Sequence, residues 1–143
     1  AQASSATIHT ERFLERWRSL PEGDWILEGA GGLRVPLNSK ETVQDLIRQL
    51  DVPALLVAST RLGCINHTLL SLASLESANI PVRGVVLSGE EDPGLIETLR
   101  DFAPHIPFLR FPLLKEVHAG TLSMQAKESF SEAMLNQLMG GLP

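Results

Sequence analysis

Apolar runs that predict strands recur along the chain, each bounded by polar or turn-forming residues. Residues 52–59 (VPALLVAS) form a continuous apolar run, which is typical of a strand covered on both faces. Residues 81–88 (PVRGVVLS) predict the next strand, and residues 106–112 (IPFLRFP) predict a short last one. A shorter run at residues 24–27 (DWIL) stops abruptly and is also interpreted as a strand.

Between these runs, apolar residues recur at the three- and four-residue spacing of amphipathic helices. The pattern predicts helices at residues 10–20, 40–50, 65–80, 92–102 and 126–141. Thr10 is predicted to cap the first helix, and Pro93 suits the first turn of the fourth. The apolar positions that carry the pattern are Phe13, Leu14, Trp17, Leu20, Val43, Leu46, Ile47, Leu50, Ile65, Leu69, Leu72, Ala73, Leu75, Phe130, Met134 and Leu138.

Strands that alternate with helices predict an α/β fold with a mainly parallel sheet, in a single domain over residues 1–143. In such sheets, ligands bind in the loops that follow the carboxyl ends of the strands. Two polar stretches, residues 28–32 (EGAGG) and 59–67 (STRLGCINH), each follow a predicted strand directly. We therefore expect these two loops to share one edge of the sheet.

Composition narrows the class of protein. The net charge is −5 with no block of lysine or arginine, which argues against a nucleic-acid surface. No apolar run approaches the ~20 residues that span a bilayer, and no signal peptide is visible, so we expect no membrane partner. The single cysteine excludes an internal disulfide framework and a zinc-type spacing, which is consistent with a reducing cytoplasm.

The EGAGG stretch places a carboxylate, Glu28, before three glycines within four residues. Glycine lets the backbone approach an oxyanion closely, and a carboxylate can hold Mg²⁺ directly or through water. The stretch therefore fits a phosphate and metal site, although a tight turn in which the glycines only supply positive φ explains the same letters equally well.

The STRLGCINH stretch places Asn66 near the predicted start of a helix, after Gly63. The free N–H groups of a helix start can bind a carboxylate or a phosphate. The alternative is that Asn66 only caps the helix and that Cys64 is a small buried hydrophobe. His67 is expected to be a surface or capping residue, and Cys64 has no signature of a catalytic nucleophile.

Together the two stretches are more specific than either alone. The blocks EGAGGLRVPLN and VPALLVASTRLGCINHTLLSLASLESANIPVRGVVL, in this order and spacing, resemble the dethiobiotin synthetase family from about Trp25 to Phe102. The resemblance implies a three-layer fold like that of P-loop NTPases, incomplete in this chain. It also implies a cytoplasmic ligase of biotin biosynthesis, active as a homodimer with sites at the subunit interface. Such an enzyme uses ATP, Mg²⁺ and CO₂ to carboxylate 7,8-diaminononanoate and close the dethiobiotin ring.

The resemblance also implies roles for individual residues, none of them a certain catalytic group. Glu28 corresponds to the Mg²⁺ ligand of the family. The nucleotide-binding positions are Glu28, Gly29, Ala30, Gly31, Gly32 and Ser88. The substrate-binding positions are Gly31, Leu62, Gly63, Cys64, Ile65 and Asn66, of which residues 62–66 receive the carboxylate tail of a diamine bound to the neighbouring subunit.

The sequence departs from the family in three places. The phosphate loop G-x-x-x-x-G-K-[ST] is absent, together with the lysine and aspartate that follow it in the family. Ser88 stands where the family usually has a base-reading asparagine, and Arg110 and Phe111 stand in its nucleotide loop. We expect the carboxyl-terminal part of a synthetase, inactive and poorly soluble alone, which needs a phosphate-loop half in cis or in trans. Two alternatives are a degenerate binding or regulatory subunit without nucleotide chemistry, and a P-loop amidoligase.

Overall fold

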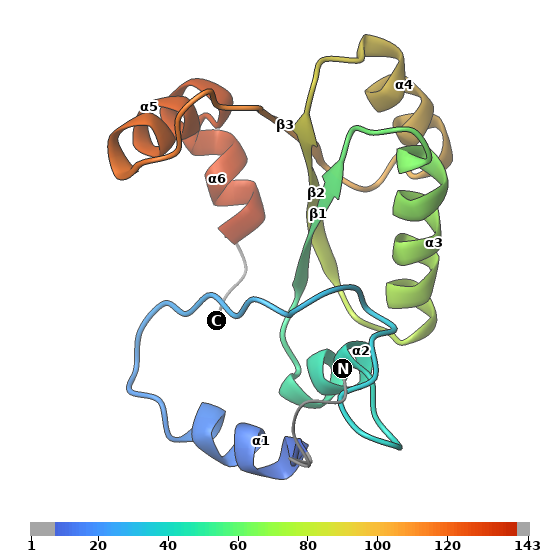
Figure 1. Cartoon of the computed structure of the whole chain (residues 1–143), viewed down its shortest axis with the longest axis vertical. Coiled ribbons are helices and arrows are strands. Elements are labelled where there is room, and N and C mark those ends of the chain that lie inside the picture. Colours follow the sequence, from blue (N-terminus) through green and yellow to red (C-terminus); the bar gives the residue numbers. More distant parts are fainter. Residues whose placement is uncertain (1–7, 140–143) are drawn as a thin grey trace.

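A computed structural model describes residues 8–139 of the chain (Figure 1). Its helices are α1 (Thr10–Arg18), α2 (Val43–Leu50), α3 (Cys64–Ser77), α4 (Pro93–Phe102), α5 (Ala119–Ser129) and α6 (Glu132–Met139). Its strands are β1 (Ala54–Ser59), β2 (Val82–Gly89) and β3 (Phe108–Pro112). The predicted alternation of strands and helices is therefore confirmed from residue 54 to residue 112.

The strands form one 3-stranded parallel sheet in the order β1-β2-β3. Helices α3 and α4 connect the strands and cover one face of the sheet, while α5 and α6 lie on the other side (Figure 1). This arrangement makes three layers and confirms the predicted α/β class. Since every strand runs in the same direction, the loops after β1, β2 and β3 meet at one edge of the sheet.

The hydrophobic core lies between the sheet and the α3–α4 layer. Val85, Leu87 and Leu99 are almost completely buried there, and each such side chain contributes about 1.5–3 kcal/mol relative to exposure. The cluster comprises Cys64, Leu72, Val85, Leu87, Leu95, Leu99, Ala103 and Phe108. Of the positions predicted to face inward on α3, Leu72 and Leu75 are buried, whereas Ile65 and Ala73 are exposed.

The prediction that residues 52–59 are covered on both faces is wrong for the described part of the chain. Leu55 and Val57 lie on the face of β1 turned away from the core, and they are 49% and 66% exposed. As described, helix α6 packs against the neighbouring strand β2 on that face, where Gly84 lets Leu138 approach the backbone closely. Among residues 8–139, no strand pairs with the outer edge of β1.

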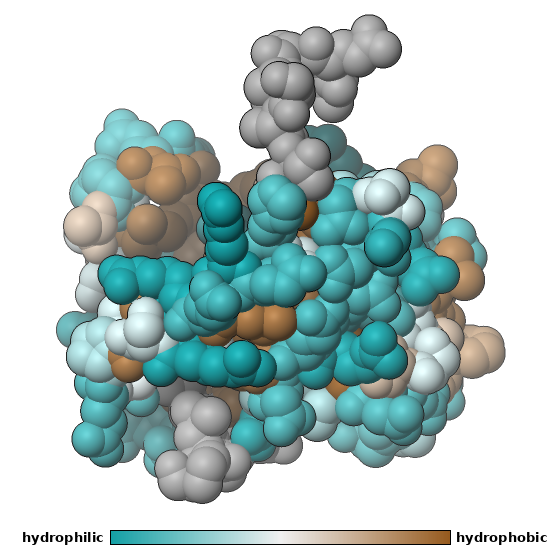
Figure 2. Space-filling model, turned by 90° about the horizontal axis from the view of Figure 1, so that it is seen from below, coloured by the Kyte–Doolittle hydropathy of each residue, from teal (hydrophilic) through white to brown (hydrophobic). Residues whose placement is uncertain are grey.

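Helices α1 and α2 pack together at the end of the sheet where β1 begins (Figure 1). Their outer surface is mostly hydrophilic, as Figure 2 shows from below. The carboxylate of Glu41 joins them, because it accepts hydrogen bonds from Asn38 Nδ2, Gln49 Nε2 and the Thr10 hydroxyl. Thr10 is therefore not the predicted cap: His9 holds that position, and Thr10 is buried in the first turn.

Two predicted elements differ in the structure. Residues 24–27 form no strand, and Ile26 is 96% exposed, because no described strand lies beside them to supply hydrogen bonds. The predicted helix at residues 126–141 is broken into α5 and α6, and residues 140–141 lie outside the described residues. The break is at Phe130, whose backbone is extended and whose ring stacks on Phe111 at 5.9 Å between centroids.

Glu41 predicts a specific loss of stability in acid. Hydrogen bonds from Asn38, Thr10 and Gln49 lower the pKa of Glu41 from its ordinary value of 4.5. The unfolded chain therefore takes up the proton first, so stability that is present above pH 4.5 is lost as the pH falls through the lower folded pKa. Thermal unfolding between about pH 3 and pH 7 should show that Glu41→Gln lowers the melting temperature at neutral pH and flattens this acid loss.

The matched control is Glu15→Gln, which removes an exposed carboxylate from α1 outside this cluster. It should leave the pH profile unchanged. Identical pH profiles for wild type and Glu41→Gln would show that the hydrogen bonds of the cluster do not stabilise the ionised form of Glu41 in the folded protein.

Candidate functional site

The loop between β1 and α3 presents the start of a helix to solvent. Gly63 is the N-cap of α3, and its φ of 89° requires glycine because a side chain rarely adopts this conformation. The His67 ring packs against Gly63 from one turn further along. Asn66 is the third residue of the helix, so the prediction that its side chain caps α3 is not confirmed.

Part of this helix start is available to a ligand. The N–H of Cys64 donates to the carbonyl of Arg61 at 2.9 Å, and the N–H of His67 donates to that of Gly63 at 3.0 Å. Within the described residues, the N–H groups of Ile65 and Asn66 have no such acceptor. These are the unpaired donors that make a helix N-terminus a site for a carboxylate or a phosphate.

A cavity of about 430 Å³ lies beside this loop, between β1 and α3. Cys64 is buried, with its Sγ 3.7 Å from the hydroxyl of Thr68, so it behaves as the expected small core residue. The lining residues are Leu56, Val57, Ala58, Ser59, Arg61, Leu62, Cys64, His67, Thr68 and Ser71. The cavity therefore combines apolar walls with hydroxyl, imidazole and guanidinium groups.

The EGAGG loop is attached to the start of α2. The carbonyls of Leu33 and Val35 accept from the N–H groups of Gln44 and Val43, at 2.9 Å and 3.0 Å. Gly31 has a φ of 84° and packs against Val35, so at least this glycine serves a turn. Gly29 lies against Val43, whereas nothing lies within 4 Å of the position that a Cβ of Gly32 would take.

Glu28, with Ala30 in the same loop, is exposed to solvent. Among the described residues, no group of three or more His, Cys, Asp or Glu side chains is placed to hold a metal ion. A single exposed carboxylate still fits Mg²⁺, which usually keeps several waters and takes only one or two carboxylates together with substrate phosphates.

The structure does not bring the two loops together. EGAGG lies with α2 near the end of the sheet where β1 begins, whereas the β1–α3 loop lies at the opposite end (Figure 1). The expectation of one shared edge depended on a strand at residues 24–27, and that strand is absent in the described structure. Glu28 and Gly63 therefore do not form one site within this chain as described.

Ser88 lies at the edge where the β1–α3 loop begins. It is in register with Ser59 on β1 and with Phe111 on β3, and its carbonyl accepts from the N–H of Thr60 at 3.3 Å. Next to it, Gly89 touches the Thr60 side chain. The carboxyl ends of the three strands therefore lie together on one surface.

Sequence reasoning missed several polar groups at this edge. Arg61 and Thr68 line the cavity, and Glu91, in the loop after β2, pairs with Arg110 of β3. Their position after a predicted parallel strand could have marked Arg61 and Glu91, whereas Thr68 is revealed only by the packing of α3 against the sheet.

Known proteins with similar sequences include an AAA-domain family and several ATP-dependent dethiobiotin synthetases. The sequence profile of a family described as an AAA domain matches residues 1–124. The ATP-dependent dethiobiotin synthetase of Agrobacterium fabrum is 39% identical over 113 residues, which are 79% of this chain and 53% of the relative. That of Christiangramia forsetii is 51% identical over 72 residues, 50% of this chain and 34% of the relative.

A biotin biosynthesis bifunctional protein of Bordetella avium is 39% identical over 113 residues, which are 77% of this chain and 24% of that protein. The chain therefore spans about half the length, or less, of the curated relatives that it matches. Within residues 8–139, no helix has both the length and the hydrophobicity that crossing a membrane requires.

The contact between Gly89 and Thr60 predicts a position that tolerates only glycine. Gly89 has a φ of 150°, and a Cβ there would lie 2.1 Å from the Thr60 hydroxyl and 3.2 Å from its backbone nitrogen. Gly89→Ala should lower the free energy of unfolding by about 1–3 kcal/mol, measured by urea titration. Gly32→Ala, which meets nothing within 4 Å, should change it by less than about 0.5 kcal/mol. Equal effects of the two substitutions would contradict this packing.

Proposed function

Because the chain belongs to the AAA-domain family and, within it, to the dethiobiotin synthetase family, we propose that it supplies the carboxyl-terminal part of an ATP-dependent dethiobiotin synthetase. The observation that carries the proposal is the start of α3, where Gly63 leaves the N–H groups of Ile65 and Asn66 without an acceptor in the described structure. A helix start of this kind suits the carboxylate tail of a diamino acid.

The proposed reaction builds a ureido ring on 7,8-diaminononanoate. One amine is carboxylated by CO₂, ATP phosphorylates the resulting carbamate, and the second amine closes the ring with release of phosphate. Leu62, Gly63, Cys64, Ile65 and Asn66 hold the tail carboxylate across the interface of a homodimer, and Gly31 contacts the substrate. A fixed tail holds both amines in position relative to the carbamate, which lowers the entropic part of the barrier.

The nucleotide is proposed to bind with Glu28, Gly29, Ala30, Gly31, Gly32 and Ser88, which requires that the missing half pair with residues 24–27 and carry the EGAGG loop to the edge of the sheet where Ser88 lies. The glycines let the backbone approach phosphate closely, and Glu28 is the carboxylate that would hold Mg²⁺. When bound, the metal ion neutralises the negative charge that accumulates on the transferring phosphoryl group. The exposure of Glu28 is compatible with a ligand that keeps its waters.

The chain is proposed to be inactive alone and to need a phosphate-loop half, in cis or in trans, in a cytoplasmic enzyme. The open edge of β1 and its exposed Leu55 and Val57 support this, because a buried parallel strand is normally covered on both faces. A further strand and its helix would cover them. The same partner would give residues 24–27 a strand to pair with.

A second candidate function is a binding or regulatory subunit without nucleotide chemistry. Ser88 favours it, because one hydroxyl cannot reproduce the paired donor and acceptor of an amide. Calorimetry distinguishes the two functions: this subunit would bind the diamine but show no response to ATP in any assembled form.

Reconstitution tests the proposal directly. This chain, mixed or co-expressed with the amino-terminal half of the Agrobacterium fabrum relative, should form dethiobiotin from diamine, CO₂ and ATP, whereas each part alone should form none. Mass spectrometry of the product is the measurement. Leu55→Lys, which places a charge on the exposed face of β1, should prevent assembly in size-exclusion chromatography, and Leu113→Lys, exposed outside the sheet edge, should not. Absence of product in every pairing would remove the enzymatic proposal.

Glu28 is tested by its metal dependence. In the reconstituted protein, Glu28→Gln keeps the shape but loses the charge, so half-maximal activity should need about tenfold more Mg²⁺, the loss of one charged ligand. Glu22→Gln removes another exposed carboxylate from the same long connection and should leave the Mg²⁺ requirement unchanged. The role assigned to Glu28 fails if both variants respond to Mg²⁺ like the wild type.

A further inference from the structure

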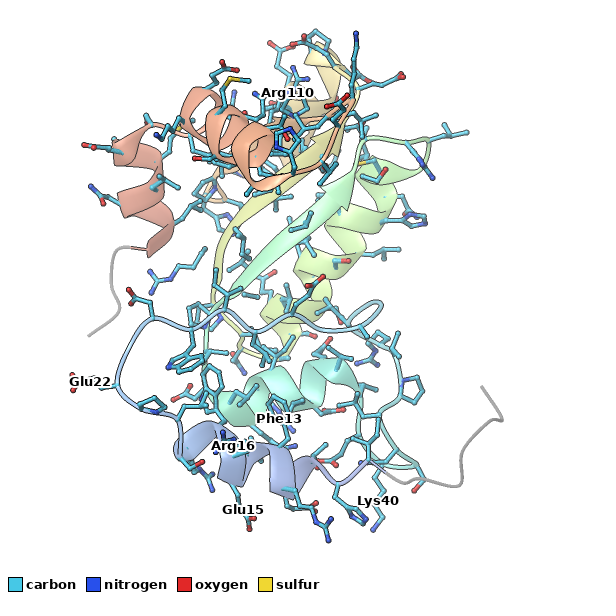
Figure 3. The ribbon with its side chains drawn as sticks, turned by 60° about the vertical axis from the view of Figure 1, so that its left-hand side comes forward. Phe13, Glu15, Arg16, Glu22, Lys40 and Arg110 are labelled. Atoms are coloured by element: carbon cyan, nitrogen blue, oxygen red, sulfur yellow. The ribbon has the colours of Figure 1, made fainter. Side chains whose placement is uncertain are left out.

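A second cavity lies between α3 and α4 at the amino ends of the strands. Its volume is about 450 Å³, within the ~300–1,000 Å³ of most small-molecule sites. Ile80 and Ile106, two of its lining residues, come shortly before β2 and β3. The cavity is therefore remote from the carboxyl ends of the strands, which Arg110 marks in Figure 3, and lies toward the end that holds Phe13 of α1. The residues that line this α3–α4 cavity are Leu69, Leu72, Ala73, Glu76, Ile80, Val82, Phe102, Ala103, His105 and Ile106.

The walls of the α3–α4 cavity are held in place by backbone hydrogen bonds. The N–H of Ile80 donates to the carbonyl of Leu75 at 3.0 Å, and the N–H of Ile106 donates to that of Ala103 at 3.1 Å. Ile80 and Ala103 are themselves buried, so part of the wall belongs to the hydrophobic core. Phe102 also lines the cavity but is 71% exposed, so the cavity opens to solvent beside this ring. A ligand could enter without first ordering these segments, which favours binding.

The lining of the α3–α4 cavity favours an apolar molecule with a positive charge. Every lining side chain is apolar except those of Glu76 and His105, which are both exposed. Among the described residues that line the cavity there is neither lysine nor arginine. An ammonium group has three donors, which the carboxylate of Glu76 and an imidazole nitrogen of His105 can accept. A carboxylate or a phosphate would instead meet the negative charge of Glu76.

We propose that the α3–α4 cavity binds a small molecule with an apolar body and a primary amine. The apolar body packs against the leucine, isoleucine and alanine side chains of the wall, and the ammonium group donates to Glu76 at the mouth. The inference does not rest on the proposed function, because none of the lining residues has a role in it. The occupant of this cavity would therefore not compete with ATP or with the carboxylate tail of the diamine.

Three probes with the same alkyl chain test the charge preference: hexylamine, hexanoate and hexanol. Saturation-transfer NMR titrations of this chain, which need little protein, give their dissociation constants. Hexylamine should bind about tenfold more tightly than hexanoate, because an exposed carboxylate attracts one charge and repels the other by modest amounts. Glu76→Gln should reduce this preference to less than about threefold. Glu97→Gln removes an exposed carboxylate of α4 outside the cavity and, as the matched control, should keep the full preference.

A second pair of variants tests the position of the site. Ala73→Phe enlarges an exposed side chain that lines the cavity, so it should weaken the binding of hexylamine and of hexanol by at least about tenfold. Ser77→Phe makes a similar change one turn further along α3, outside the lining, and should leave both affinities unchanged. Thermal unfolding shows whether each variant is folded, and Ala73→Leu replaces Ala73→Phe if that variant is not.

Three results would overturn the inference. Equal affinities of hexylamine and hexanoate would show that Glu76 selects no charge. Binding that the Ala73 variants do not weaken would show that the amine lies elsewhere on the protein. Absence of binding by all three probes would show that the cavity takes no small apolar amine, and a changed elution volume of Ala73→Phe in size-exclusion chromatography would then identify a second copy of the chain as its cover.

Discussion

The parallel pairing of β1 with β2 is the interaction on which the rest of this structure depends. It aligns Leu56 and Ala58 with Val85 and Leu87, so that one face of the sheet closes over α3 and α4. It also carries the β1–α3 loop to the ends of the other strands, where the Thr60 N–H bonds to Ser88. This pairing does not cover the opposite face of β1, and Leu55 and Val57 remain exposed there.

The difference between the covered and the exposed face of β1 explains why one candidate loop has its geometry within the chain and the other does not. Residues that depend only on the covered face, such as Gly63 and the first turn of α3, have their geometry within the chain. The expected place of Glu28 and its glycines at the same edge depended on a strand at residues 24–27, and a strand needs a neighbour for its backbone hydrogen bonds. Without one among the described residues, the EGAGG loop is instead held by the first turn of α2, at the far end of the sheet.

The helices and strands that depend mainly on a short stretch of sequence were predicted correctly. Asp92 and Pro93 mark the start of α4, and the apolar runs mark β1, β2 and β3, all of which the structure confirms. Thr10 and Phe130 were misjudged because their states are set by distant contacts. The Thr10 hydroxyl prefers Glu41, 31 residues away in sequence, to its own helix. Phe130 leaves the helical conformation where its ring stacks on Phe111.

The part of the candidate site that could be predicted is the part whose backbone conformation is set by the motif itself. Gly63 imposes a left-handed turn, and this turn alone sets the direction of the following N–H groups, so RLGCINH could be interpreted without knowledge of its neighbours. Glu28 differs, because the position of its loop depends on contacts outside the motif, with the carbonyls of Leu33 and Val35 held by the start of α2. The same distinction applies to Arg110 and Glu91, which pair only because β2 and β3 are adjacent in the sheet.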